Sequence, residues 1–304
     1  MDSYDVVIAG AGPAGMSAAL VLGRACRRVL LCDTGTPRSW ASKEMHAYLS
    51  RDGIAPARFL DIARREVDAY AGVSFAPVEV TGARRLVNGF SVALAGGERV
   101  RARKLLIATG LFDILPRIPG IDGMFGRSVF QCPYCDGWEM RGKRIAVYGR
   151  RQRGFQMARA MTAWGKDIVL CSDGPSRFTA EQRRQLDRNG IRLVETRVTA
   201  LEGKRGRLQS VVFADGSTLA RDTLFFDTPS RGQSRLAASL GCRFGRNGGV
   251  LCGEYEATSV PGVYVAGNIT RDVQLSIVAA AEGARAAFGI NRALTREDFA
   301  KRAS

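Results

Sequence analysis

Apolar runs that end in glycine-rich turns recur along the chain and predict two similar α/β units. The first unit opens with the apolar run 5–10 (DVVIAG), typical of a buried parallel strand, and continues with a helical pattern over 16–22. The second unit repeats this order, with an apolar run at 144–149 (RIAVYG), a helical pattern over 155–164 and an apolar strand at 168–171. Strands that alternate with helices predict an α/β fold built on parallel sheets.

The turn of the first unit has the glycine spacing of a dinucleotide-binding site. In GAGPAG, Gly10 permits a tight turn, Gly12 lets the backbone approach a pyrophosphate, and Gly15 lets the helix pack closely on the strand. The helix N-terminus then faces the phosphates. A second strand, 29–32, ends in an aspartate whose carboxylate suits ribose hydroxyls. The pattern predicts a site formed by Gly10, Gly12, Pro13, Ala14, Gly15 and Asp33.

Three further patterns surround the second unit. Short alternating segments over 73–103 predict an antiparallel meander that leads into the apolar strand 104–110 (KLLIATG). A later apolar strand, 262–268 (GVYVAGN), precedes a helix that begins at about Val273. These segments belong with the first unit, although the second unit lies between them in the sequence.

Segments 114–120 and 246–250, rich in proline and glycine, flank the second unit and are interpreted as hinges. We therefore expect two Rossmann-like domains, the second inserted into the first. The first, discontinuous domain would comprise residues 1–115 and 246–304, and the inserted domain residues 116–245.

The glycine turn of the second unit departs from the pattern at its centre. Aligned with the first turn, GRRQRG places Gly149 on Gly10 and Gly154 on Gly15, but it places Arg151 on Gly12. An arginine side chain then stands where the backbone would have to approach a pyrophosphate. Dinucleotide binding by the second domain is therefore doubtful.

The stretch 132–139 (CPYCDGWE) carries the candidate chemistry. Cys132 and Cys135 can close a small reducible disulfide ring, and Asp136 can give a proton to a leaving thiolate or take one from it. Half of a zinc site would need a second Cys or His pair, but the other five cysteines form no CxxC and His46 is the sole histidine. A c-type haem would need a histidine at position 136. The sequence favours a redox centre and predicts no metal site.

Composition and charge bear on the cellular compartment and on the kind of partner. The 304 residues are 46% hydrophobic, enough for two globular cores, and the seven cysteines without a signal peptide favour a reducing, cytoplasmic compartment. The uncharged stretch 6–23 contains a Gly-Pro cluster, so no membrane segment is expected. Lys and Arg number 45 against 29 acidic residues, which gives +16. Such a charge can attract an acidic partner, although a solvated, arginine-rich surface is the commoner explanation. Nucleic acid is unlikely, because the basic residues follow no recognition motif.

Taken together, the GAGPAG turn, the ATG strand, the CxxCD centre and GVYVAGN make the chain similar to the low-molecular-weight thioredoxin reductase family over nearly its whole length. The resemblance implies FAD as cofactor, a homodimer, and thioredoxin or a similar dithiol or disulfide protein as partner. It also implies that Cys135 faces the flavin, that Cys132 reacts with the external partner, and that Asp136 is the acid-base catalyst. Further cofactor-binding residues implied are His46, Thr109, Gly110, Gly267, Asn268 and Gln274. A surface or structural role is the alternative for His46.

Two departures from the family bear on function. NADPH-dependent members carry GxGxxA and a His-Arg-Arg cluster, where this chain has GRRQRG and, after the next strand, Ser172-Asp173-Gly174-Pro175. Conventional NADPH use is therefore doubtful. Branches without the signature include the deeply branching cyanobacterial type, the ferredoxin-linked and flavin-linked reductases, and the gliotoxin- and holomycin-type dithiol oxidases. Pro133-Tyr134 resembles the oxidases, whereas Asp136 resembles the reductases.

Three functions follow as hypotheses. The first is a flavin-dependent, thioredoxin reductase-like disulfide oxidoreductase whose electron donor is not conventionally bound NADPH but, for example, an acidic protein such as ferredoxin. The second is a dioxygen-dependent oxidase of a small dithiol. The third, a redox-silent flavin-binding interaction protein, is disfavoured by the intact CPYCD.

Overall fold

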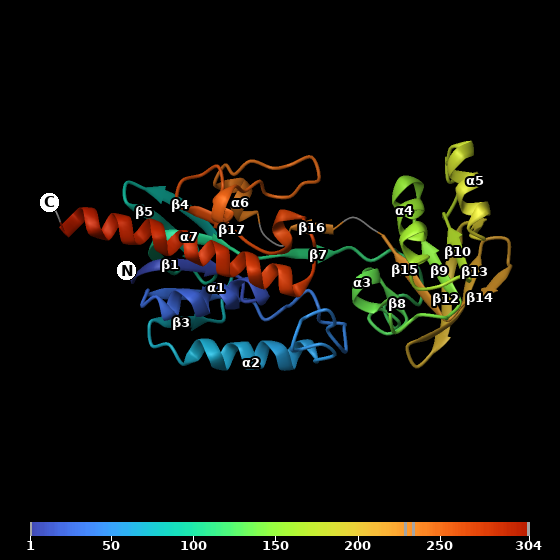
Figure 1. Ribbon diagram of the computed structural model, residues 1–304, viewed down its shortest axis with the longest axis horizontal. Coiled ribbons are helices and arrows are strands. Elements are labelled where there is room, and N and C mark those ends of the chain that lie inside the picture. The colour runs from blue at the N-terminus through green and yellow to red at the C-terminus, as the bar shows by residue number, and fades with distance from the viewer. Residues whose placement is uncertain (1, 228–229, 233–234, 303–304) are drawn as a thin grey trace.

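Two α/β domains lie side by side along the long axis of the structure (Figure 1). The structure is a computed structural model that describes residues 2–227, 230–232 and 235–302. Both ends of the chain lie on the first domain, and the middle of the chain forms the second domain (Figure 1). The expected fold class, two Rossmann-like domains with the second inserted into the first, is confirmed.

The first domain is built on a seven-stranded sheet in the order β3-β2-β1-β6-β5-β4, with β17 also paired to β6. Its parallel pairings join β1 (Ser3–Ala9), β2 (Val29–Cys32), β3 (Val73–Ala76), β6 (Arg99–Ile107) and β17 (Val263–Val265). Antiparallel pairings add β5 (Gly89–Leu94) and then β4 (Val80–Leu86). Apolar side chains cover both faces of the parallel part, as the continuous apolar runs predict.

The meander expected over 73–103 is wrong at its first strand. β3 pairs in parallel with β2, and only β4, β5 and β6 are antiparallel neighbours. The reason is the helix α2 (Pro56–Asp68), which lies between β2 and β3 in the chain and returns it to the same end of the sheet, as a βαβ crossover does.

Two helices pack against each other on one face of this sheet. The helix α1 (Pro13–Arg24) follows the GAGPAG turn, and the long α7 (Ser276–Arg302) crosses it (Figure 1). Gly283 makes their close approach possible, because a Cβ there would lie 2.0 Å from the carbonyl oxygen of Ala14. Among the described residues, no helix has the length and apolar character needed to cross a membrane.

The second domain repeats this plan with a five-stranded parallel sheet in the order β11-β10-β9-β15-β8. The strands are β8 (Val129–Phe130), β9 (Ile145–Tyr148), β10 (Ile168–Cys171), β11 (Arg192–Val194) and β15 (Thr223–Phe226). One face carries α4 (Arg151–Met161) and α5 (Ala180–Arg188). The other carries the antiparallel strands β12 (Val198–Lys204), β13 (Arg207–Phe213) and β14 (Thr218–Ala220).

Two short antiparallel strands carry the chain between the domains. On the way out, β7 (Leu111–Asp113) precedes the proline-rich segment 114–120, and on the way back β16 (Ser230–Gly232) pairs with β7. The two crossings therefore form a ribbon whose backbones are hydrogen-bonded to each other.

The second hinge, expected at 246–250, is wrong, and so is the domain boundary at 245/246. Residues from α6 (Leu236–Ser239) onward already pack in the core of the first domain, where Leu236, Cys242 and Val250 are buried with Val7. The glycines of RNGGV form a tight turn within that domain, because the Gly245 N–H donates to the carbonyl of Gly249. Short 3₁₀ turns follow at Glu254–Glu256 (η1) and Asn268–Thr270 (η2).

Candidate active site

A cleft of about 1910 Å³ brings most of the predicted site residues together. Its lining includes residues of both domains, among them Cys132 and Asp136 of the second. Gly15 and Cys135 lie next to lining residues, and His46 lies outside the lining. The predicted residues that line it from the first domain are Gly10, Gly12, Pro13, Ala14, Asp33, Thr109, Gly110, Gly267, Asn268 and Gln274.

The glycines of the first turn have distinct roles in its geometry. Gly10 has a φ of +103°, and a Cβ on Gly15 would lie 1.8 Å from the Gly10 carbonyl oxygen, so both positions require glycine for the backbone itself. A Cβ on Gly12 would meet no protein atom within 4 Å and would point into open space. The packing of the chain therefore does not require glycine at position 12.

Two carboxylates accept hydrogen bonds from the backbone of the first domain, one at this turn and one at Gly267. Asp33 accepts hydrogen bonds from the N–H groups of Ala11 and Gly35, at 3.0 and 2.9 Å. At the other fingerprint, the Gly267 N–H donates to Glu282 Oε2 at 2.6 Å. Glu282, on α7, was missed by the sequence analysis, because a helix pattern gives no signal for a contact with a strand end. Burial raises the pKa of its carboxyl, an effect opposed by the bond to Gly267.

The residues present fit a dinucleotide in this cleft. Thr109 Oγ1 is buried and has no hydrogen-bond partner among the described residues, although it lies on the cleft wall. A buried hydroxyl without a partner is costly, so a polar ligand group at this wall would satisfy it. Gly12 leaves space for a pyrophosphate at the N-terminus of α1.

The cysteine pair lies at the start of a single helical turn, α3 (Pro133–Asp136), directly after β8. Cys132 and Cys135 form a disulfide with Cα atoms 5.3 Å apart, and the Cys135 N–H points at Cys132 Sγ at 3.1 Å. The proline at the first helical position favours the turn, because its missing N–H would have no partner there. Cys132 lines the cleft, so the disulfide lies at the edge of the cleft.

Asp136 has the proton affinity that an acid-base group needs at neutral pH. Burial and the negative charge of Glu139 raise its pKa to about 7, although His46 acts in the opposite direction. His46 was expected beside the cofactor, but its ring lies among carboxylates, with Nδ1 3.5 Å from Asp52 and Nε2 3.5 and 3.7 Å from Glu44 and Glu139. Glu139 had no assigned role in the sequence analysis, although it lies in the same stretch.

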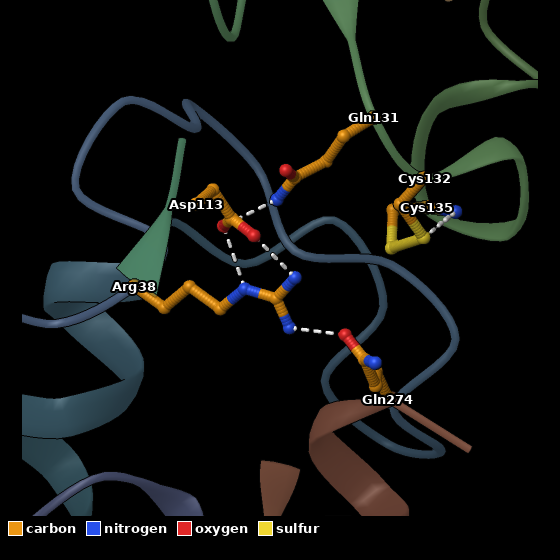
Figure 2. Close-up of a disulfide and its surroundings, with 6 residues drawn as sticks. All are labelled: Arg38, Asp113, Gln131, Cys132, Cys135 and Gln274. Atoms are coloured by element: carbon orange, nitrogen blue, oxygen red, sulfur yellow. Dashed lines mark hydrogen bonds and ion pairs between the residues drawn. A yellow bond between two sulfur atoms is a disulfide. The ribbon is translucent and has the colours of Figure 1, made fainter. Parts of the chain in front are cut away.

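A partly buried polar network near the disulfide was not predicted. Figure 2 shows Asp113 between the guanidinium of Arg38 and the side-chain amide of Gln131. The remaining terminal nitrogen of Arg38 donates to Gln274 at 2.6 Å. The available signal was the isolated charge of Asp113 at the end of an apolar segment, but the sequence does not identify its partners.

At the carboxyl end of β10, polar groups of the second domain are bonded to each other. Asp173, after β10, accepts hydrogen bonds from Tyr148 Oη at 2.9 Å and from the Val198 N–H at 3.0 Å, and it pairs with Arg150. Gly149 and Gly154 still touch, since a Cβ on Gly154 would lie 2.0 Å from the Gly149 carbonyl oxygen. The strand-turn-helix geometry is therefore kept, while the polar groups at its edge are bonded internally.

Internal pairing also reduces the basic surface around this edge. Three of the eight basic residues between positions 140 and 166 form ion pairs, namely Arg144 with Asp222, Arg150 with Asp173 and Arg153 with Asp227. The basic residues of this stretch are Arg141, Lys143, Arg144, Arg150, Arg151, Arg153, Arg159 and Lys166.

The other five cysteines lie apart from the disulfide. Cys32, Cys171 and Cys242 are buried, and burial raises the pKa of the first two thiols to about 12. Cys26 and Cys252 are exposed. In the described parts of the chain, no group of three or more His, Cys, Asp or Glu side chains is arranged so that it could hold a metal ion.

Comparison with known proteins agrees with this architecture. Residues 4–283 match the pyridine nucleotide-disulphide oxidoreductase family. Thioredoxin reductase tcpT of Claviceps purpurea is 31% identical over 87% of this chain and 86% of its own. The solved structure of HlmI is 36% identical and superposes with a TM-score of 0.95 over 99% of this chain and 95% of its own. An oxidoreductase from Agrobacterium tumefaciens is 31% identical, with a TM-score of 0.90 over 97% and 99%.

The fold, the cleft and these relatives agree on one class of enzyme. The chain belongs to the pyridine nucleotide-disulphide oxidoreductase family and is a thioredoxin reductase-like, FAD-dependent disulfide oxidoreductase.

Proposed function

We propose that FAD is held along the cleft by the first-domain fingerprints. Gly12 would give the pyrophosphate room, and the Asp33 carboxylate, at the end of β2, would bind the ribose hydroxyls. Thr109 and Gly110, with Gly267, Asn268 and Gln274, line the rest of the cleft toward the cysteine pair. FAD bound there would supply a two-electron acceptor and donor.

We propose that the Cys132–Cys135 pair is the redox centre. In the oxidising direction, one thiolate of a substrate dithiol attacks Cys132 Sγ, breaks the disulfide and leaves Cys135 as a thiolate. Asp136, with a pKa near 7, supplies the proton that this thiolate takes up. The second substrate thiol then loses its proton and attacks the substrate sulfur bonded to Cys132, which breaks the mixed disulfide. Cys132 leaves as a thiolate and takes up that proton, so the substrate becomes a disulfide and the cysteine pair, now a dithiol, carries two electrons. The reducing direction is the reverse of these steps.

We propose that NADPH bound in the second domain is not the donor. The observation that carries this proposal is the internal bonding of Asp173 by Arg150, Tyr148 and Val198 at the edge where a nucleotide would bind. The 2′-phosphate of NADPH would have to displace these bonds and would bring its negative charge next to the Asp173 carboxylate, which repels it. An acidic protein such as ferredoxin is a donor that needs no such pocket, and thioredoxin or a similar protein is the disulfide partner proposed with it.

A second function, oxidation of a small dithiol by dioxygen, is favoured by the surroundings of Cys132. The cleft around it contains the side chains of Trp40, Tyr134 and Phe112, which are exposed by 66%, 73% and 50%. Exposed aromatic groups that converge on a cleft are typical of sites that bind apolar small molecules. This function uses the same cysteines and needs no reductant other than its substrate.

Anaerobic stopped-flow measurements of flavin absorbance test the proposal. We expect dithiothreitol to reduce the flavin of the wild-type enzyme but not that of Cys135→Ser, and we expect NADPH at millimolar concentration to reduce it slowly and without saturation. Fast, saturable reduction at micromolar NADPH would contradict the proposed donor. Reduction by reduced ferredoxin supports the reductase, whereas rapid reoxidation by dioxygen during dithiol turnover supports the oxidase.

A further inference from the structure

Asp113 is the meeting point of three parts of the molecule. It ends β7, the outgoing strand of the ribbon between the domains. Its carboxylate accepts two hydrogen bonds from Arg38 of the first domain, from Nε and from a terminal nitrogen, both at 2.6 Å. It accepts a third from Gln131 of the second domain, also at 2.6 Å. A single carboxylate on the ribbon is therefore hydrogen-bonded to a side chain of each domain (Figure 2).

The hydrogen bond from Gln131 to Asp113 also positions the cysteine pair, because Gln131 is next to Cys132 in the chain. Gln131 lies between β8 and α3, immediately before Cys132. The bond from its side chain to Asp113 fixes the chain one residue from the sulfur that lines the cleft. Arg38, in turn, donates to Gln274, which lines the same cleft from the first domain.

Partial burial and charge strengthen the bond between Arg38 and Asp113. The Asp113 side chain is 10% exposed and that of Arg38 is 23% exposed, so water competes weakly for their two parallel hydrogen bonds. Bidentate arginine–carboxylate bonds fix orientation as well as distance, because two donors of a planar group must both be aligned. Rotation of the second domain away from the cleft would have to break the Gln131 bond to this fixed carboxylate.

We propose that Asp113, held by Arg38, is a positioning residue that keeps the Cys132–Cys135 pair at the flavin cleft. The inference rests on the proposed role of these cysteines as the redox centre. Asp113 lines the cleft as well, and in this role it acts on the cysteines through Gln131.

Two variants weaken or remove the hydrogen bond between Gln131 and Asp113, one by changing the acceptor and the other by removing the donor. Asp113→Asn keeps the size of the side chain but removes its charge and one acceptor, and Gln131→Leu removes the donor. Both are expected to retain FAD and to lower the rate of anaerobic flavin reduction by dithiothreitol by about 10²-fold, because a shift of about 1 Å between reacting groups has an effect of this size. The loss should fall on the limiting rate, with the dithiothreitol concentration at half-saturation unchanged.

A matched control and a rescue exclude a general effect of lost ion pairs. Asp222→Asn breaks a bidentate pair of the same kind, with Arg144, in the second domain outside the cleft, and should leave the rate unchanged. Gln131→Glu places a second carboxylate against Asp113 and should slow the reaction. The double variant Asp113→Asn with Gln131→Glu restores one donor and one acceptor and should recover at least tenfold over the single Gln131→Glu variant.

Small-angle X-ray scattering of the oxidised FAD-loaded proteins gives a readout independent of chemistry. Asp113→Asn and Gln131→Leu should show a changed distance distribution between the domains, and Asp222→Asn should match the wild type. Wild-type rates in Asp113→Asn and Gln131→Leu with unchanged scattering would overturn the inference. If Asp113→Asn loses its flavin, Gln131→Leu decides alone. Failure of dithiothreitol to reduce the wild-type flavin would instead refute the cysteine centre itself.

Discussion

At the scale of single residues, the environment of Asp136 sets the chemistry available to the cysteine pair. An aspartate in water is ionised at neutral pH and has no proton to give. Here burial and the charge of Glu139 raise its pKa to about 7, so near neutrality both the acid and the base form are populated. The same carboxyl can then protonate a leaving thiolate in one half-reaction and accept a proton in the other.

Glu139 and His46 shift the pKa of Asp136 in opposite directions, so removing one or the other charge should have opposite effects. Opening of the disulfide by an external thiolate needs the protonated acid, so the rate per thiolate should fall as pH rises through about 7. Glu139→Gln removes the charge that raises this pKa and should move the fall to lower pH, whereas His46→Gln removes the charge that lowers it and should move the fall to higher pH. Stopped-flow pH profiles measure both shifts, and Asp136→Asn should abolish the fall. Shifts of both variants in the same direction would refute this assignment.

At the scale of elements, the two strand-turn-helix units share a backbone contact but differ in the position that faces a ligand. In both, the first and last glycines of the turn touch, as shown by the Cβ contacts of 1.8 and 2.0 Å that Gly15 and Gly154 would make. At the middle position the first unit has Gly12, and the second has Arg151 with a φ of +52°. The glycine contact that joins strand and helix is therefore the same in the two turns. The residue at the middle position, where a pyrophosphate would need room, differs.

Two substitutions in the first turn should separate folding from cofactor binding. Gly12→Arg enters open space, so the apoprotein should keep its stability within about 0.5 kcal/mol, as surface changes usually do, but it should purify without flavin. Gly15→Ala forces a Cβ onto the Gly10 carbonyl and should destabilise the fold by about 3 kcal/mol. Flavin absorbance and urea unfolding of the apoproteins measure the two effects. A fully flavin-loaded Gly12→Arg protein would show that the phosphates lie elsewhere.

At the scale of the whole molecule, the net charge of +16 does not translate into one uniform basic surface. Arg150 and Arg153 are paired with Asp173 and Asp227, so reversing their charge would also disturb internal contacts. Arg151 and Arg159 lie exposed on α4 and are better probes of an acidic partner. Exposed charges act through long-range attraction, which salt screens.

Charge reversal at these two positions tests the protein partner. Arg151→Glu with Arg159→Glu should lower the association rate with thioredoxin or ferredoxin by roughly tenfold at low salt, and the difference should vanish at high salt. Reduction by dithiothreitol should not change. Arg84→Glu with Arg85→Glu, exposed on β4 of the first domain, is the control of equal charge. Equal loss in both double variants would mean that net charge, not this face of α4, governs the encounter.

The sequence alone determined the features that depend on local pattern. Two Rossmann-like domains, one inserted into the other, were predicted from the continuous apolar strands, the GAGPAG turn and the repeat at 144–171. This was possible because strand burial and glycine spacing depend on residues that are close in the sequence. The CPYCD stretch likewise identified the disulfide, since its two cysteines lie within one helical turn.

The tertiary structure decided what depends on contacts between distant segments. The return to the first domain precedes α6, because Leu236 and Val250 bury themselves against a sheet formed far away in the sequence. Arg38, Asp113 and Gln131 meet across two domains, and Asp173 bonds to Arg150 and Tyr148 from other elements. Hydrogen bonds between side chains leave no periodic trace along a chain, so only the folded arrangement reveals which polar groups are free for a ligand and which are bonded within the protein.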